Sequence, residues 1–346
     1  MKFRILGTES LGVRGLSCII EAGNRRILVD PGVALGFTRY GLHPHPIQAA
    51  VGEIVRGSIV EEWKRSTDII ITHFHGDHTP LYNANPFQLG LRRLRDLRGR
   101  ARLWVKSEVF MTWRERLRAQ YVYKFFHEED VVRGGCSDHI VLSKPVPHGA
   151  SNSTSVVLVA VRDGRRTLVH MSDTQLLSEE AVEIALSWEP DIVVTDGPPL
   201  YRWHSNKSFH RKMLKKAWRN AWRIACSVDT LIIDHHLMRC MEGLKWVDSL
   251  SEETGANVLC AADIIGKPAL LLEAWRKLLY EKIPVPNDWY IDYGRGTVCL
   301  KPYREIARRL VEELPKARFY DMNIVDEILD NIVSEFDPNE NIRQKD

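Results

Sequence analysis

The segment His73-Phe74-His75-Gly76-Asp77-His78 constrains this chain more than any other, because it gathers three imidazoles and a carboxylate within six residues. It directly follows the run Asp68-Ile69-Ile70-Ile71-Thr72. A short β-branched run bounded by polar residues predicts a buried strand. The cluster therefore stands where a strand ends, and its side chains are expected to share one cavity.

The donor types in this segment indicate a metal site. Imidazole nitrogens and carboxylate oxygens together suit zinc, manganese or iron and disfavour calcium. His73 and His75 alternate with Phe74 and face the same way, whereas Asp77 and His78 follow around the turn. This split predicts two adjacent divalent metal ions, with zinc as the first choice. The alternative is a surface histidine cluster without a ligand, against which four donors in six residues argue.

The string THFHGDH, from Thr72 to His78, resembles the HxHxDH signature of the metallo-β-lactamase superfamily, whose members bind one or two metals between two β-sheets. The resemblance covers about residues 1 to 265 in motif order, and its specificity lies in five successive blocks. Closest in detail are the tRNA 3′-end processing endonucleases, and an archaeal branch with HFHGDHTPL and IIDHH blocks is also similar. The implied fold is a four-layer αββα sandwich of the α/β (α+β) class.

The resemblance also implies ligands beyond the first block. It assigns His73, His75 and His148 to one metal, Asp77, His78 and His235 to the other, and Asp173 to the carboxylate shared by both. Asp30 closes the strand-like run 25–29 and is expected to accept a hydrogen bond that fixes a ligand imidazole.

The triplet Asp234-His235-His236 offers two candidates for the last histidine ligand. His235 is preferred because residues 231–235 repeat the layout of residues 69–73, as expected of two related halves. His236 is then expected to point the other way, as a supporting or core residue. The reverse assignment of the two histidines stays open.

Three residues are candidates for direct roles in catalysis. Asp77 is expected to orient the nucleophile in addition to binding metal. Asp196 falls where the tRNA endonucleases carry a Glu, although the rest of that His-Glu-Ala-Thr motif and their protruding tRNA-binding arm have no counterpart here. His204 follows the same strand and is a candidate proton donor to the leaving group, with an exposed loop histidine as the alternative.

Strand-like and helix-like segments alternate after an opening β-meander, which predicts stacked sheets covered by helices. Helices are expected over residues 86–98 and 269–280, among others. Pro284 and Pro286 break the pattern. We therefore expect one metallo-β-lactamase-like domain over residues 1–281 and a C-terminal helical extension over residues 282–346 that packs on the same domain.

The composition indicates a globular protein and gives little information about its partners. With 44% hydrophobic and 27% charged residues in 346, the chain can bury a large core. A net charge of +3 does not by itself indicate a nucleic-acid partner. The basic stretches 91–100 and 210–219 either bind a polyanion or form solvated faces of amphipathic helices, and the second interpretation is favoured. Scattered cysteines and the lack of a signal-like or membrane-length apolar run predict a cytoplasmic protein without a membrane partner.

Together these features predict a metal-dependent hydrolase in which a metal-bound hydroxide attacks a phosphodiester or related ester, in a small molecule or a nucleic acid. The alternatives are a thioester or lactone hydrolase and a non-catalytic metal-binding protein of the same fold. Loss of hydrolysis with retention of the fold is expected for Asp77→Ala and His75→Ala.

Overall fold

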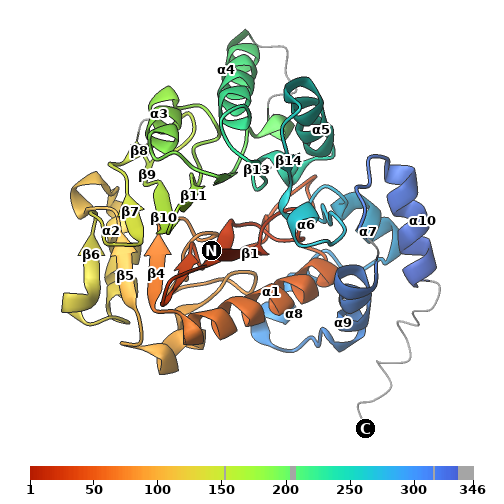
Figure 1. Ribbon diagram of the computed structural model, residues 1–346. Helices are drawn as coiled ribbons and strands as arrows, with labels where there is room; N and C mark the ends of the chain where they lie inside the picture. The colour runs from red at the N-terminus through yellow and green to blue at the C-terminus, as the bar shows by residue number, and fades with distance from the viewer. Residues whose placement is uncertain (152, 203–207, 315, 334–346) are drawn as a thin grey trace.

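Two six-stranded β-sheets face each other at the centre of the molecule, and helices cover both outer faces (Figure 1). The computed structural model describes residues 1–151, 153–202, 208–314 and 316–333. In the view of Figure 1, α3, α4 and α5 lie above the sheets and α1 lies below them. This four-layer αββα sandwich is the fold expected from the sequence.

The first sheet contains the strand that precedes the histidine-rich segment. It consists, in spatial order, of β1 (Lys2–Gly7), β2 (Ser17–Ala22), β3 (Arg25–Val29), β4 (Asp68–Ile71), β5 (Arg102–Val105) and β6 (Val131–Arg133). The first two pairings are antiparallel and the next three are parallel. Strand β4 is buried along its whole length, as its unbroken apolar run requires in a sheet covered on both faces.

The second sheet repeats this pairing pattern. It consists, in spatial order, of β7 (Ile140–Leu142), β10 (Val159–Asp163), β11 (Arg166–His170), β12 (Ile192–Thr195), β13 (Thr230–Ile233) and β14 (Val258–Leu259). Two antiparallel pairings are again followed by three parallel ones. The fourth strand is β4 in the first sheet and β12 in the second, whereas β13 is the fifth. The expected equivalence of β4 and β13, which rested on the similar layout of their ends, is therefore wrong.

Side chains that alternate along the strands build two hydrophobic clusters. Ile70 faces the second sheet, where it joins a cluster with Ile20, Ile27, Val159 and Leu168. Its neighbours on β4 point the other way, toward the helices, as the period of two in a strand dictates.

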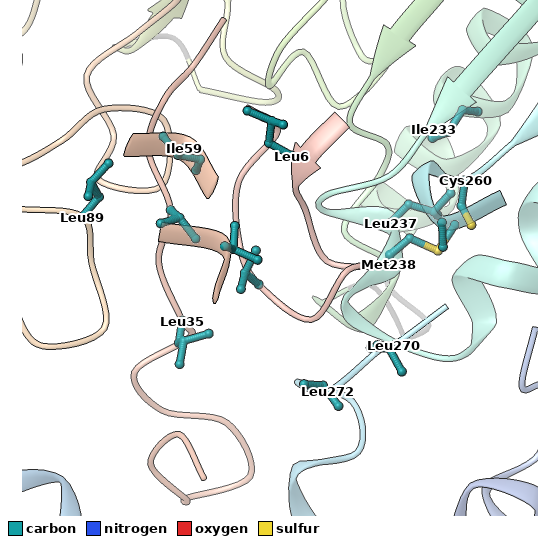
Figure 2. Close-up of a cluster of buried hydrophobic side chains, with 14 of the residues drawn as sticks. Leu6, Leu35, Ile59, Leu89, Ile233, Leu237, Met238, Cys260, Leu270 and Leu272 are labelled. Carbon is teal, nitrogen blue, oxygen red and sulfur yellow. The ribbon is translucent and has the colours of Figure 1, made fainter. Parts of the chain in front are cut away.

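The larger cluster lies on the outer faces and under the helices. Figure 2 shows part of it, with Leu6 and Ile59 on one side and Ile233, Leu237 and Cys260 on the other. Because Leu6 is the second-last residue of β1 and Ile233 is the last of β13, this cluster supports the strand ends near which the polar side chains gather.

The helices surround the two sheets. They are α1 (Pro46–Arg65), α2 (Trp113–Tyr123), α3 (Glu179–Ser187), α4 (Ser208–Ala225), α5 (Glu242–Thr254), α6 (Ala261–Ile264), α7 (Arg276–Lys282), α8 (Trp289–Arg295), α9 (Lys301–Arg308) and α10 (Met322–Val333). Short 3₁₀ helices include η1 (Leu91–Leu97), η4 (Leu200–Arg202) and η5 (Leu237–Arg239), and β8 (Val146–Pro147) pairs with β9 (Ser155–Val156) in a small hairpin. None of the described helices is long and apolar enough to span a bilayer.

Two expected helices are shorter than the sequence pattern suggested. Residues 91–97 form a 3₁₀ helix, because Leu91, Leu94 and Leu97 recur every three residues and all three are buried. In the segment 269–280 the helix starts only at Arg276, because the Leu270 N–H donates to the Ser10 carbonyl at 2.8 Å instead of entering a helical turn.

The C-terminal helices pack against the rest of the chain. Ile306 and Leu329 belong to the same hydrophobic cluster as the core of residues 1–281. The Trp289 Nε1–H donates to the Pro44 carbonyl at 3.0 Å, next to the start of α1. The segment after residue 281 therefore shares its core with the sandwich.

Candidate metal centre

The polar residues singled out in the sequence follow the ends of β3, β4, β11, β12 and β13, and they meet at one edge of the sandwich. Within each sheet these strands are parallel neighbours. The carboxyl ends of parallel strands lie at the same edge, which is how chain segments up to about two hundred residues apart converge.

The first ligand group consists of His73, His75, His148 and Asp173, whose ligand atoms all lie within 4.8 Å of one another. Asp173 Oδ2 is 3.2 Å from His148 Nε2 and 3.6 Å from His73 Nε2. His73 and Asp173 are buried, whereas His75 and His148 are partly exposed. The group is therefore open to the outside on the side of these two imidazoles.

The second ligand group consists of Asp77, His78 and His235, again with ligand atoms within 4.8 Å of one another. His235 Nε2 lies 3.3 Å from His78 Nε2 and 3.8 Å from Asp77 Oδ2. Asp173 reaches this group too, with Oδ1 3.1 Å from His78 Nε2 and Oδ2 3.5 Å from His235 Nε2. One carboxylate thus touches both groups, at the place where a shared ligand was expected.

Two buried atoms of these groups lack a well-formed hydrogen bond, although Asp173 Oδ1 has the close contact with His78 Nε2 given above. Neither His73 Nε2 nor Asp173 Oδ1 has a well-formed hydrogen bond to any residue that the structure describes. An unsatisfied buried polar atom costs about 1–3 kcal/mol. A divalent cation would satisfy both, and the mixed nitrogen and oxygen donor set fits zinc, manganese or iron.

Asp30 fixes one ligand imidazole from behind. Its Oδ2 lies 2.8 Å from His78 Nδ1 and accepts from the Thr72 hydroxyl at 2.8 Å, while its Oδ1 accepts from the Thr72 N–H at 2.8 Å. With Nδ1 held in this way, His78 presents Nε2 to the second ligand group. This is the position that the sequence predicted for Asp30.

Glu9 and Arg239 are neighbours of the second ligand group that sequence reasoning missed. Glu9 Oε2 lies 2.7 Å from His235 Nδ1, and Glu9 Oε1 accepts from Arg239 Nε at 2.7 Å. The available signals were weak: Glu9 stands two residues after β1, and Arg239 stands four residues after His235. Both contacts depend on the approach of β1 to the end of β13.

His236 faces the cluster instead of pointing away from it, which corrects the expected orientation. One of its ring nitrogens lies within 4.8 Å of ligand atoms of Asp173 and His235. Its Nδ1 is 2.8 Å from Asp196 Oδ2, and Asp196 Oδ1 accepts from the Gln175 N–H at 2.7 Å. Asp196 is fully buried and belongs to neither ligand group; it contacts His236, which faces the cluster.

Left-handed backbone at three strand ends explains part of this arrangement. Asp30, Ser172 and His235 have φ of 47°, 51° and 48°. Non-glycine residues occupy this region uncommonly, and such strain concentrates at functional sites. At His235 the chain leaves strand geometry, so His236 is not turned to the opposite face as it would be within a strand.

Burial and neighbouring imidazoles keep part of the first ligand group neutral. Burial, followed by the charges of His78 and His75, holds the pKa of His73 well below its usual value. Burial and His148 lower the pKa of His75 to about 4. Both rings therefore have free nitrogen lone pairs at neutral pH.

In the second ligand group the pKa values of the two histidines are raised instead of lowered. Burial lowers the pKa of His78, but Asp173 and Asp30 outweigh it and raise that pKa well above its usual value. At His235 burial is likewise outweighed, by Glu9 and Asp173, and the pKa rises to about 10. Without a cation, these two imidazoles are protonated at neutral pH.

The remaining predicted features lie elsewhere or outside the described residues. His204 falls within residues 203–207, which the structure does not describe. The basic stretch 91–100 places Arg92, Arg95 and Arg98 on the exposed side of η1. The stretch 210–219 lies on α4, where Ala217 faces the core and the charged side chains flank it.

The sequence is similar to those of known proteins. The sequence model of the family described as Metallo-beta-lactamase superfamily matches residues 12–211. A UPF0282 protein of Methanosarcina mazei is 40% identical over 306 residues, covering 88% of this chain and 99% of that protein.

Similar solved structures include a CmlA beta-hydroxylase E377D mutant, with a TM-score of 0.43 and 18% identity over 72% of this chain and 51% of that one. The match thus spans about half the length of that hydroxylase. They also include human tRNase Z, short form, with a TM-score of 0.35 and 12% identity over 68% of this chain and 92% of that one.

Proposed function

Because the chain belongs to the metallo-β-lactamase superfamily, and within it to the UPF0282 proteins, we propose that it is a metal-dependent hydrolase. The observation that carries the proposal is the convergence of both ligand groups on the single carboxylate of Asp173. A divalent cation supplies Lewis acidity, which activates water near neutral pH and polarises the bond to be cleaved.

The first ligand group would hold one cation and the second ligand group another, with zinc as the first choice and manganese or iron as alternatives. The supporting residues act on the ligand imidazoles. Asp30 and Glu9 each contact the Nδ1 of one imidazole, so that the Nε2 atoms of His78 and His235 point at the site. Such partners keep ligand rings in one orientation and raise their basicity.

The pair Asp196–His236 provides a proton at the site. Burial and the charge of Asp173 raise the pKa of Asp196 well above its usual value, so this carboxyl keeps its proton and bonds His236 Nδ1. A neutral imidazole that accepts at Nδ1 carries its own proton on Nε2. We assign His236 Nε2 as the donor to the leaving group, with Asp196 as the residue that positions the ring and replaces its proton.

A basic hollow near the site favours a phosphodiester over an uncharged thioester or lactone. Its volume is about 680 Å³, and its lining includes the side chains of Arg92, Arg95, Arg98 and Lys124. Tyr82 and Tyr121 stack beside them, with ring centroids 4.3 Å apart. Cationic side chains together with stacked aromatic rings suit a substrate with phosphates and bases.

Two links join this hollow to the ligand groups. Tyr82 stands four residues after His78 on the same loop. Arg118, on the same helix as Tyr121, donates to the Phe74 carbonyl at 2.7 Å. A phosphodiester held by the hollow would therefore lie beside the loop that carries His73 to His78.

The test is a substrate-class screen on purified protein loaded with zinc, manganese or iron. Bis-nitrophenyl phosphate and a thioester are assayed side by side, with His75→Ala and the control His139→Ala. We expect phosphodiester hydrolysis that falls at least ~100-fold in His75→Ala and is unchanged in His139→Ala. Hydrolysis of the thioester alone would move the assignment to acyl substrates, and a metal-loaded protein inert to both would indicate a binding protein.

A further inference from the structure

A buried arginine faces the second ligand group. The short helix η5 directly follows His235 and His236, and Arg239 is its last residue. The Arg239 side chain is 4% exposed. Its Nη2 lies 3.2 Å from His235 Nε2 and 3.6 Å from Asp77 Oδ2. Two of the three residues of this group thus meet a guanidinium at the atoms that they would offer to a cation.

The guanidinium is held in this place from two sides. Arg239 Nε donates to Glu9 Oε1 at 2.7 Å, and Nη1 lies 3.4 Å from the Tyr201 hydroxyl. Burial leaves the side chain little room to swing away. Because a guanidinium stays charged at every physiological pH, its positive charge is a permanent part of the site.

The first ligand group has no such neighbour. Among the described residues, Asp173 forms close charge contacts with histidines, whereas Asp77 also meets Arg239. No arginine or lysine that the structure describes therefore lies against the ligand atoms of the first group. A cation in the second group is repelled by a positive charge that already lies against two of its ligands.

We propose that Arg239 makes the two ligand groups unequal. The group of His73, His75, His148 and Asp173 binds a divalent cation tightly, and the group of Asp77, His78 and His235 binds a second one at least about tenfold more weakly. The guanidinium lies beside Asp77 and offers positive charge to an anionic substrate. In this respect it takes the place of a second cation. The inference depends on the proposed function only in that the chain binds a divalent cation.

The test is the stoichiometry of cation binding, which does not require activity. Zinc is titrated into metal-free protein by calorimetry, and retained ions are counted by native mass spectrometry after dialysis. We expect wild-type protein to keep one ion and to bind the second at least about tenfold more weakly. In Arg239→Met the second affinity should approach the first, and two ions should be retained.

The control is Arg39→Met, because Arg39 contacts the Arg239 carbonyl and the Tyr201 ring but forms no contact with the described ligand atoms. It should leave both affinities unchanged. If Arg239→Met folds poorly because it leaves the Glu9 carboxylate unpaired, Glu9→Gln/Arg239→Met is compared with Glu9→Gln alone. The second affinity should then be higher in the double variant, and an equal or lower value would overturn the proposal.

Two equal affinities in wild-type protein would overturn the proposal, whether or not the variants fold. A fall in the second affinity in folded Arg239→Met would overturn it too, because the arginine would then support the site. Failure of the proposed function is distinct: it shows as absence of any tight cation, or as tight binding without hydrolysis.

Discussion

Glu9 Oε2 lies 2.7 Å from His235 Nδ1, which ties the loop after the first strand to a residue 226 positions later in the chain. Both side chains are buried, and the Gly15 N–H lies 3.3 Å from the same ring nitrogen. The orientation of His235 is therefore set by the N-terminal segment of the chain.

Removing this carboxylate should loosen the second ligand group. We expect Glu9→Gln to lower the affinity for the second cation by about 10–100-fold, because partners of ligand imidazoles have effects of that size. Zinc calorimetry measures the change. Glu21→Gln, on neighbouring β2 and 43% exposed, is the control and should bind as wild-type does. Equal affinities in the two variants would contradict the role of Glu9.

Separate substitutions of the two adjacent histidines distinguish ligand from proton donor. His235→Ala should lower the affinity for the second cation more than about tenfold, because it removes a ligand. His236→Ala should leave cation binding within about twofold and reduce kcat by roughly 100-fold, because it removes a general acid. Metal titration and steady-state kinetics measure both. Loss of cation binding in His236→Ala instead would reverse the two assignments.

Gly32 is a point where the backbone of one loop touches that of another. A Cβ there would lie 2.2 Å from the Thr79 nitrogen and 2.3 Å from the His78 carbonyl carbon. Because backbone atoms cannot yield as a flexible side chain can, Gly32→Ala should destabilise the fold by about 3 kcal/mol or more. Urea denaturation measures this change.

The matched control is Gly57→Ala in α1, where a Cβ meets nothing within 4 Å. Since alanine is preferred to glycine inside a helix, this variant should gain about 0.5–1 kcal/mol. A stable Gly32→Ala variant with intact cation binding would show that the two loops are not packed as described.

Cation binding should release protons. In the metal-free protein the pKa of His235 is raised to about 10 and that of His78 also lies well above its usual value, so both rings are charged at pH 7. His75, with its pKa lowered to about 4, is already neutral. Filling the second ligand group should expel about two protons, and affinity should rise with pH above 7. Calorimetry in buffers of different ionisation heat counts the protons.

The same shifts fix the sign of stability against pH. A histidine whose pKa is raised on folding stabilises the metal-free fold fully below its unfolded value of about 6.5. That contribution is lost as pH rises toward 10. This histidine should therefore lower the Tm of the metal-free protein as the pH rises from 6.5 to 10. Other titrating groups act equally in His235→Gln, so the Tm of that variant should fall less. An equal fall in both proteins would contradict the shift.

The candidate ligand residues could be picked out because most stand in a short local pattern at the end of a strand. His73 to His78 and the triplet with Asp173 are readable in this way, and so is Asp30. The geometry of His236 was not, because the backbone turn at His235 depends on a left-handed φ that the sequence does not announce. Glu9 and Arg239 carry no local pattern, since their roles arise from contacts between distant segments.

The secondary structure, too, could be predicted where the pattern is local and could not where it depends on tertiary contacts. The strands with unbroken apolar runs, such as β4 and β13, were found where expected. The leucines at 91, 94 and 97 suited a helix, but only their spacing of three distinguishes a 3₁₀ turn from an α-helix. Where tertiary pairing competes with helix formation, as at Leu270, the sequence pattern misleads.

In the proposed function, Asp173 joins two ligand groups into one metal-dependent hydrolytic site. The most direct measurement is the metal content of freshly purified wild-type and Asp173→Asn protein, taken with their phosphodiesterase activities. We expect at least one tightly bound divalent ion and measurable hydrolysis in wild-type protein, and loss of both in a folded Asp173→Asn variant. Equal metal content and equal activity in the two proteins would contradict it.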